Sequence, residues 1–260
     1  MSNIKAAFFD FDRTLFDHKT HSFIESAIKS INQIQAKGIK IFINSARSYY
    51  SLQSLKTFDI FNFDGFVVSN GGAAFTKNKI LYAHYLNKPT AKKIIDICKE
   101  NQISYLISTL KTSYIEVFED KSNVEKFYNV FYEGYPLPIE DYNQEDIIAI
   151  QIFSESSKDD LFKDIKDAKP NRFFEYCLEF TSKEFIKSEG IEAIISEIGY
   201  NVDEICAFGD DLNDIDMFKL VKYGICMGNG NPIAKTHAFH VTTNIEEDGI
   251  LNALKFLQIL

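Results

Sequence analysis

The chain begins with apolar segments that alternate between strand-like and helix-like spacing. Residues 4–11 form a short apolar run typical of a buried strand, and residues 21–38 carry apolar side chains at a helical period. A second apolar run at 39–46, a helix-like segment at 49–58 and a third strand at 63–75 follow. Strands that alternate with helices predict a parallel sheet covered by helices.

The pattern changes between about residues 80 and 184, where helical segments are followed by paired strands, twice over. This order predicts an antiparallel sheet with helices on one of its faces. The α/β pattern resumes after residue 185. We therefore expect a Rossmann-like α/β core formed by residues 1–79 and 185–260, with an inserted α+β domain at 80–184. The inserted segments are helices at 90–101 and 157–168 and strands at 79–86, 104–110, 113–119, 146–154 and 171–182.

Composition narrows the class of protein. The 28 Lys and Arg against 37 Asp and Glu give a net charge of -9, which argues against general nucleic-acid binding. No apolar run approaches the roughly 20 residues of a membrane helix, and the first residues do not resemble a secretory signal. The four cysteines are scattered, and the five histidines lack metal-site spacing. We expect a cytoplasmic protein with no membrane or nucleic-acid partner; the pattern leaves its oligomeric state open.

Acidic residues follow two of the apolar strands of the predicted core. Asp10 and Asp12 end the first strand, and the strand "ICAFG" leads directly into Asp210 and Asp214. One such acid is common in a turn or a helix cap, but two acidic strand ends on one sheet are harder to explain that way. Adjacent carboxylates repel each other unless a cation lies between them, and oxygen ligands suit Mg²⁺. The sequence thus predicts a magnesium site.

These residues resemble the signatures of haloacid dehalogenase-type phosphohydrolases. "DFDRTL" is similar to their first motif, DxDGT, "INSAR" to the second, Lys187 to the third and "GDDLNDIDM" to the fourth, GDxxNDxxM. "SNGGA", "CMGNGNP" and "EEDGI" resemble further signatures of the Cof-type subfamily. The insert lies between motifs two and three, where that subfamily has its α/β cap, although the insert itself matches no motif.

The resemblance implies an Mg²⁺-dependent phosphatase and gives each residue a role. Asp10 is the nucleophile that forms an aspartyl phosphate, and Asp12 is the general acid and base. Alternative interpretations stay open for three side chains, since Ser45 could cap a helix, Lys187 could be a solvated lysine and Asp214 could complement a helix dipole. The implied metal ligands are Asp10, the Asp12 carbonyl and Asp210, the phosphate-binding residues are Ser45, Lys187 and Asn213, and Asp214 holds a metal-bound water or Lys187.

Two positions depart from the family pattern. Arg13 stands where the family has Gly, so either the turn has an ordinary φ or strain is accepted there. The Arg13 head could meet the leaving group of the substrate, or lie solvated on the rim of the site. Ala46 replaces a second Gly. Arg47 is interpreted as a surface residue at a helix start and is left outside the site.

The expected substrates are small soluble phosphate monoesters, such as sugar phosphates or related metabolites. A phosphomutase of similar chemistry and a non-catalytic phosphate-sensing protein are the alternatives. The inserted domain contributes no catalytic residue, so we expect it to act as a lid that sets substrate choice. Aromatic residues of its sheet are candidates for substrate contacts, with cap core as the alternative for each of them: Tyr105, Tyr114, Phe153 and Tyr176.

Overall fold

The structure is a computed structural model that describes residues 3–131 and 134–260. The chain forms two compact units. The first comprises the chain up to Arg47 together with Thr57–Tyr82 and Ile186–Leu260, and the second comprises Ser48–Lys56 and Ala83–Phe185. Residues 48–56, which the sequence-based division assigns to the core, therefore group with the second unit.

The first unit is built on an eight-stranded sheet within the described residues, in the order β16-β15-β14-β1-β4-β5-β6-β7. Strands β16 to β5 of this order run parallel, and β6 is antiparallel to β5. The α/β core expected from the sequence is confirmed. The strands are β1 (Ala6–Phe9), β4 (Lys40–Asn44), β5 (Gly65–Val68), β6 (Ala73–Thr76), β7 (Ile80–Ala83), β14 (Ile205–Gly209), β15 (Tyr223–Cys226) and β16 (His240–Val241).

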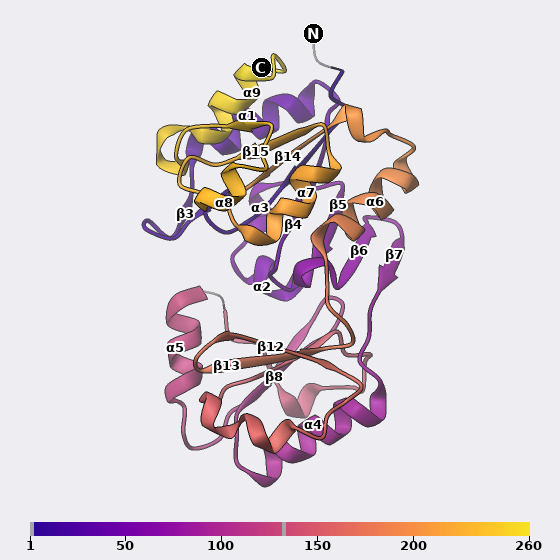
Figure 1. Ribbon diagram of the computed structural model, residues 1–260, viewed down its shortest axis with the longest axis vertical. Helices are drawn as coiled ribbons and strands as arrows, with labels where there is room; N and C mark the ends of the chain where they lie inside the picture. Colours follow the sequence, from indigo (N-terminus) through magenta and orange to yellow (C-terminus); the bar gives the residue numbers. More distant parts are fainter. Residues whose placement is uncertain (1–2, 132–133) are drawn as a thin grey trace. The chain divides into compact units, whose positions relative to one another are not determined.

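Helices cover both faces of this sheet (Figure 1). Phe8 and Phe42 stack at 4.7 Å and point toward the face covered by α6 and α7, while α1 and α9 pack together on the opposite face. Alternating side chains of β1 and β4 thus serve two cores, which explains their nearly continuous apolar sequence. The helices of the first unit are α1 (Glu25–Ala36), α3 (Thr57–Ile60), α6 (Lys187–Ile198), α7 (Ile215–Leu220), α8 (Pro232–Lys235) and α9 (Gly249–Phe256), whereas α2 (Tyr49–Ser54) groups with the second unit.

Short elements fill the connections of the first unit. Strands β2 (Phe16–Asp17) and β3 (Ser22–Phe23) pair antiparallel directly after β1, and His18 lies in the turn between them. Short 3-10 turns are η1 (Ser69–Gly71), η4 (Val202–Glu204), η5 (Leu212–Asp214) and η6 (Ile245–Glu247).

The second unit contains a six-stranded sheet in the described chain, ordered β10-β9-β8-β11-β13-β12 (Figure 1). All its pairs are antiparallel except the short β10–β9 pair. The elements are β8 (Tyr105–Ser108), β9 (Ser113–Glu116), β10 (Leu137–Pro138), β11 (Ala149–Ile152), β12 (Lys169–Phe174), β13 (Cys177–Thr181), α4 (Lys88–Glu100), α5 (Ser122–Phe131), η2 (Ile139–Asp141) and η3 (Ser156–Phe162).

The expectation that helices cover only one face of this second sheet is wrong. Helix α4 and the turn η3 pack on the face of Tyr105 and Ile107, whereas α5 packs on the face of Leu106 and Phe153. The segment expected as a helix at 157–168 is only the 3-10 turn η3. Helix α5 does carry a sequence signal, since its buried Val124, Phe127 and Tyr128 follow the helical spacing i, i+3, i+4.

Two expectations from composition concern cysteines and membranes. All four cysteines are free and buried, as expected for small apolar side chains. Within residues 3–131 and 134–260, every helix is too short or too polar to serve as a membrane span.

Candidate active site

The candidate site lies where three neighbouring parallel strands end. Phe9, the last residue of β1, is in register with Phe208 of β14 on one side and with Ile43 of β4 on the other. The next residues along each strand therefore emerge at one edge of the sheet, which is the edge where ligands bind in open α/β sheets. The main chain holds this arrangement, because Asp10 N donates to Phe208 O over 2.8 Å.

A buried lysine joins two of the acidic residues. Lys187 Nζ, at the start of α6, donates to Asp10 Oδ1 at 2.6 Å and to Asp214 Oδ1 at 2.8 Å, and its side chain is 0% exposed. Burial alone would lower the pKa of Lys187, but the two carboxylates raise it above its ordinary value. Lys187 is therefore a charged member of the site and not a solvated surface lysine.

The surroundings of the Asp10 carboxyl group disfavour its ionised form. Burial raises the pKa of Asp10 well above its ordinary value, Lys187 opposes this effect, and the neighbouring Asp214 and Asp210 add to it. A further cation beside Asp10 would favour the ionised form.

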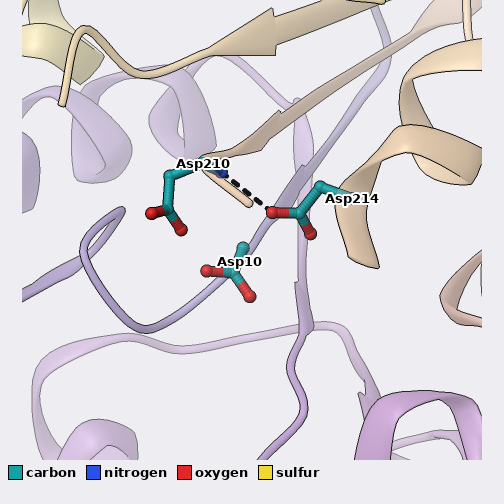
Figure 2. Close-up of side chains that lie close together, drawn as sticks. All are labelled: Asp10, Asp210 and Asp214. Carbon is teal, nitrogen blue, oxygen red and sulfur yellow. Dashed lines mark hydrogen bonds between the residues drawn. The ribbon is translucent and has the colours of Figure 1, made fainter. Parts of the chain in front are cut away.

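Asp214 is a buried carboxylate whose two oxygens are both in use. Oδ1 accepts from Lys187, and Oδ2 accepts from the main-chain N–H groups of Asp210 at 2.8 Å and Asp211 at 3.0 Å (Figure 2). The loop closes tightly here, since a Cβ on Gly209 would lie 2.5 Å from the Asp214 carboxylate. Asp214 thus fixes both the loop after β14 and the lysine.

The three carboxylates of Asp10, Asp210 and Asp214 point toward a common space (Figure 2), with ligand oxygens within 4.8 Å of one another. Asp210 Oδ2 is buried and accepts no hydrogen bond from the described residues. Burial raises the pKa of Asp210 to about 7, and the charge of Arg13 opposes this rise. An all-oxygen set with an unsatisfied carboxylate oxygen fits a hard divalent cation such as Mg²⁺. Since Asp214 is committed to hydrogen bonds, Asp10 and Asp210 are the carboxylates with oxygens to offer.

Asp12 is held from two sides by basic side chains. Arg47 donates from Nε to Oδ2 at 2.9 Å and from Nη2 to Oδ1 at 2.8 Å, and His18 Nε2 lies 2.6 Å from Oδ1. Burial alone would raise the pKa of Asp12, but Arg47 and His18 lower it to about 2. In this arrangement Asp12 is ionised at neutral pH.

Arg47 corrects the sequence-based interpretation, which left it at the surface and outside the site. Its side chain is only 3% exposed and pairs with Asp12 across 35 residues of chain. A signal was available, because Arg47 follows Ser45 by two residues at a strand end that neighbours Asp12. His18 has no comparable sequence signal, since its place depends on the short β2–β3 hairpin.

Ser45 and Asn213 both contact Asn70 in the turn η1. Ser45 is fully buried, its Oγ accepts from Arg47 N at 3.1 Å, and its carbonyl accepts from Asn70 N at 3.0 Å. Asn213 is exposed, and its amide donates to Asn70 Oδ1 at 3.1 Å. Both residues thus reach the strand-end region, Ser45 through the main chain of β4 and Asn213 at its outer margin.

Arg13 adopts a left-handed conformation with φ of 60°, so strain is accepted at this position. Its guanidinium faces the loop after β14, with Nη1 3.3 Å from Asp210 Oδ2 and Nη2 donating to Asn229 O at 2.5 Å. Half of the side chain is exposed, yet its charged end contacts a candidate metal ligand.

Comparisons with known proteins identify relatives of this chain. A family model described as haloacid dehalogenase-like hydrolase matches residues 7–254. YkrA of Bacillus subtilis, provisionally named a phosphatase, is 26% identical, with 98% of each chain covered. The solved structure of the HAD subclass IIB sugar phosphatase BT4131 is also 26% identical, with a TM-score of 0.78 and with 98% of this chain and 100% of that chain covered. A Geobacillus kaustophilus protein at 23% identity, with 99% and 100% covered, shares the fold with a TM-score of 0.88.

Proposed function

From the premise that the chain belongs to the haloacid dehalogenase-like hydrolases and is a phosphatase, we propose that it hydrolyses small soluble phosphate monoesters through an aspartyl phosphate on Asp10, with Mg²⁺ as cofactor. One observation carries the proposal: Asp10 is paired with a buried Lys187 and lies next to Asp210, whose buried Oδ2 accepts no hydrogen bond from the described residues, at the ligand-binding edge of the sheet. A phosphate-sensing protein without activity would need neither the nucleophile nor the acid and base.

In the proposed reaction, a carboxylate oxygen of Asp10 bonds to phosphorus while the bond between phosphorus and the ester oxygen breaks. A proton passes from Asp12 to the departing alcohol oxygen. Asp12 then accepts a proton from a water whose oxygen attacks phosphorus, which releases phosphate and restores the Asp10 carboxylate.

The surroundings of Asp12 favour its role as a general base over its role as a general acid. With a pKa of about 2, Asp12 is ionised at neutral pH and ready to accept a proton from water. Protonating the leaving group requires a proton on Asp12 against the pull of Arg47 and His18. Esters of acidic alcohols, which depart with little protonation, should therefore react fastest in the first step.

Asp10, Asp210 and the main-chain carbonyl of Asp12 would hold Mg²⁺, which supplies positive charge against the phosphoryl oxygens. Lys187 contributes a second fixed positive charge beside Asp10. We assign Ser45 and Asn213 to phosphate binding as well, the Ser45 assignment being supported by its buried position at the end of β4. Asp214 keeps Lys187 and the loop of Asp210 in place.

We propose that the second unit sets substrate choice, because it carries none of these residues. Sugar phosphates are candidate substrates, since the similar protein BT4131 is a sugar phosphatase. Three of the aromatic candidates are engaged in packing within the second unit. Tyr105 lies in the hydrophobic core under α4, the ring of Tyr114 packs against Tyr142, and Phe153 lies in the core under α5. Polar side chains on the α5 face of the sheet are better candidates, such as Gln151 and Glu179, which are hydrogen-bonded at 3.1 Å.

Hydrolysis of p-nitrophenyl phosphate by the purified full-length chain tests the proposal. We expect turnover with Mg²⁺, loss of turnover after EDTA treatment and recovery when Mg²⁺ is restored. Asp10→Asn is the matched control: its amide keeps the shape of the side chain but is a poor nucleophile, so the rate should fall at least about a thousandfold while the protein stays folded. Full activity after exhaustive chelation, or in Asp10→Asn, would contradict the mechanism.

A further inference from the structure

Arg13 occupies a position that favours residues without a Cβ. Arg13 has a φ of 60°, a left-handed conformation that is unfavourable for an ordinary L-residue. The conformation is held by the main chain, because Arg13 N donates to Phe16 O at 2.8 Å. A large cationic side chain at such a position points to a role for that side chain.

The contacts of Arg13 fix its guanidinium beside Asp210. Nη2 donates to the carbonyl of Asn229, and the Asn229 amide returns a hydrogen bond to the Arg13 carbonyl at 2.9 Å. The Asn229 side chain is itself anchored, since its Oδ1 accepts from Ile245 N at 2.8 Å. Nη1 then stands 3.3 Å from Asp210 Oδ2, the buried oxygen that accepts no hydrogen bond from the described residues.

We propose that Arg13 is a resident cation of the metal site, which neutralises Asp210 in the metal-free protein and weakens the binding of a divalent ion there. The proposal rests on the metal site assigned under the proposed function. It names this side chain as a determinant of metal affinity, at a position where the family motif has Gly and no charge.

The physical reason is the repulsion between two cations that share one carboxylate. An ion bound to Asp210 would lie within a few ångströms of a fixed guanidinium, so binding must work against that charge or displace it. Arg13 is half-exposed, and solvent screening limits the effect. We expect removal of the charge to tighten Mg²⁺ binding about tenfold, which is modest against the unscreened repulsion of such charges.

Isothermal titration of the substrate-free, full-length chain with MgCl₂ tests this. Arg13→Gln removes the charge and retains a side chain with a Cβ, and we expect its Kd for Mg²⁺ to be about tenfold lower than that of the unmodified chain. Lys79→Gln makes the same change in net charge at a lysine that pairs with Glu197, and it should leave the Kd unchanged. An unchanged or higher Kd in Arg13→Gln would overturn the proposal, the higher value indicating that Arg13 orients Asp210 for the metal.

Arg13→Gly separates charge from backbone strain. The glycine variant has neither the positive charge nor the backbone strain. It should bind Mg²⁺ as tightly as Arg13→Gln and should melt at a higher temperature than Arg13→Gln. A Kd equal to that of the unmodified chain would overturn the charge argument. Two outcomes distinguish this proposal from the proposed function. If no variant binds Mg²⁺ and phosphatase activity survives chelation, the assigned metal site is wrong and both proposals are refuted. If Mg²⁺ binds but its Kd does not depend on Arg13, only the present proposal is refuted.

Discussion

At the scale of single residues, the ionisation of Asp12 is set by Arg47. The buried guanidinium and the carboxylate form a two-point contact, which Lys could not reproduce with its single charged nitrogen. Removing the guanidinium leaves a mostly buried carboxylate whose remaining side-chain partner among the described residues is His18. The pair therefore contributes both to stability and to the position of the proposed acid and base.

We expect Arg47→Met to destabilise the folded chain by about 1–3 kcal/mol at pH 7, because it removes one partner of a largely buried pair. The folded pKa of Asp12 is depressed to about 2, so the contribution is present above the unfolded pKa near 4 and disappears as pH falls through about 2. Urea unfolding of both proteins at a series of pH values measures this difference.

Lys40→Met serves as the control for Arg47→Met. It breaks a more exposed and longer ion pair, with Asp64 at 3.8 Å, and should change stability by less than about 1 kcal/mol. A destabilisation by Arg47→Met that is independent of pH would mean that packing, and not the charge of Asp12, accounts for the loss.

At the scale of elements, the site depends on how closely α6 approaches the sheet. Lys187 opens this helix, and Gly190 faces β5 one turn later. A Cβ on Gly190 would lie 2.4 Å from Val67 Cγ1, and Val67 is a β-branched residue with little rotamer freedom. The glycine therefore permits the contact that brings Lys187 to Asp10.

Gly190→Ala should destabilise the chain by about 1–3 kcal/mol, because overpacking against Val67 outweighs the gain in helix propensity of up to about 1 kcal/mol. Thermal and urea unfolding measure the loss, and kcat should fall with it as α6 shifts. Ser196→Ala, at an exposed position of the same helix, is expected to stay within about 0.5 kcal/mol of the unmodified chain. Equal or higher stability of Gly190→Ala would show that the helix can move away at no cost.

At the scale of the whole molecule, chemistry and substrate choice are expected to belong to different units. Asp10, Arg47, Lys187 and Asp210 all belong to the first unit, while Glu179 and Gln151 belong to the sheet of the second. Burial raises the pKa of Glu179, and the Gln151 amide opposes this effect. A partly desolvated carboxyl with an oxygen to spare is suited to hydrogen-bonding hydroxyl groups.

Glu179→Gln should change the ranking of kcat/KM among phosphate esters with different alcohols, by about tenfold for the most affected ester, since one hydrogen bond to a charged group is worth about 1.5–3 kcal/mol. The Mg²⁺ requirement should not change. Glu100→Gln, an equal charge change on the exposed side of α4, is the control. If the ranking is untouched by Glu179→Gln and by substitutions of its neighbours on that face, specificity resides in the first unit.

Local sequence was sufficient for the core of the fold and for the acids of the site. Apolar strands at 4–11, 39–46 and 205–209 are recognisable because strands buried on both faces need apolar residues throughout, and polar residues at their ends then stand out. The segment of α5 has apolar residues at helical spacing. The prediction that helices cover only one face of the second sheet was wrong because it did not include this helix.

Local sequence places the polar residues at the ends of elements: Asp10 and Asp12 follow one strand, Ser45 follows another, Asp210 and Asp214 follow a third, and Lys187 opens a helix. Which charged side chains contact one another depends on how these elements pack in the folded chain. The pairing of Arg47 and His18 with Asp12, and of Arg13 with Asp210 across 197 positions of the chain, depends on the adjacency of β1, β4 and β14 and on the left-handed turn at Arg13. Such contacts are long-range, and a local pattern specifies the conformation of a segment but not the partner that its side chains will find.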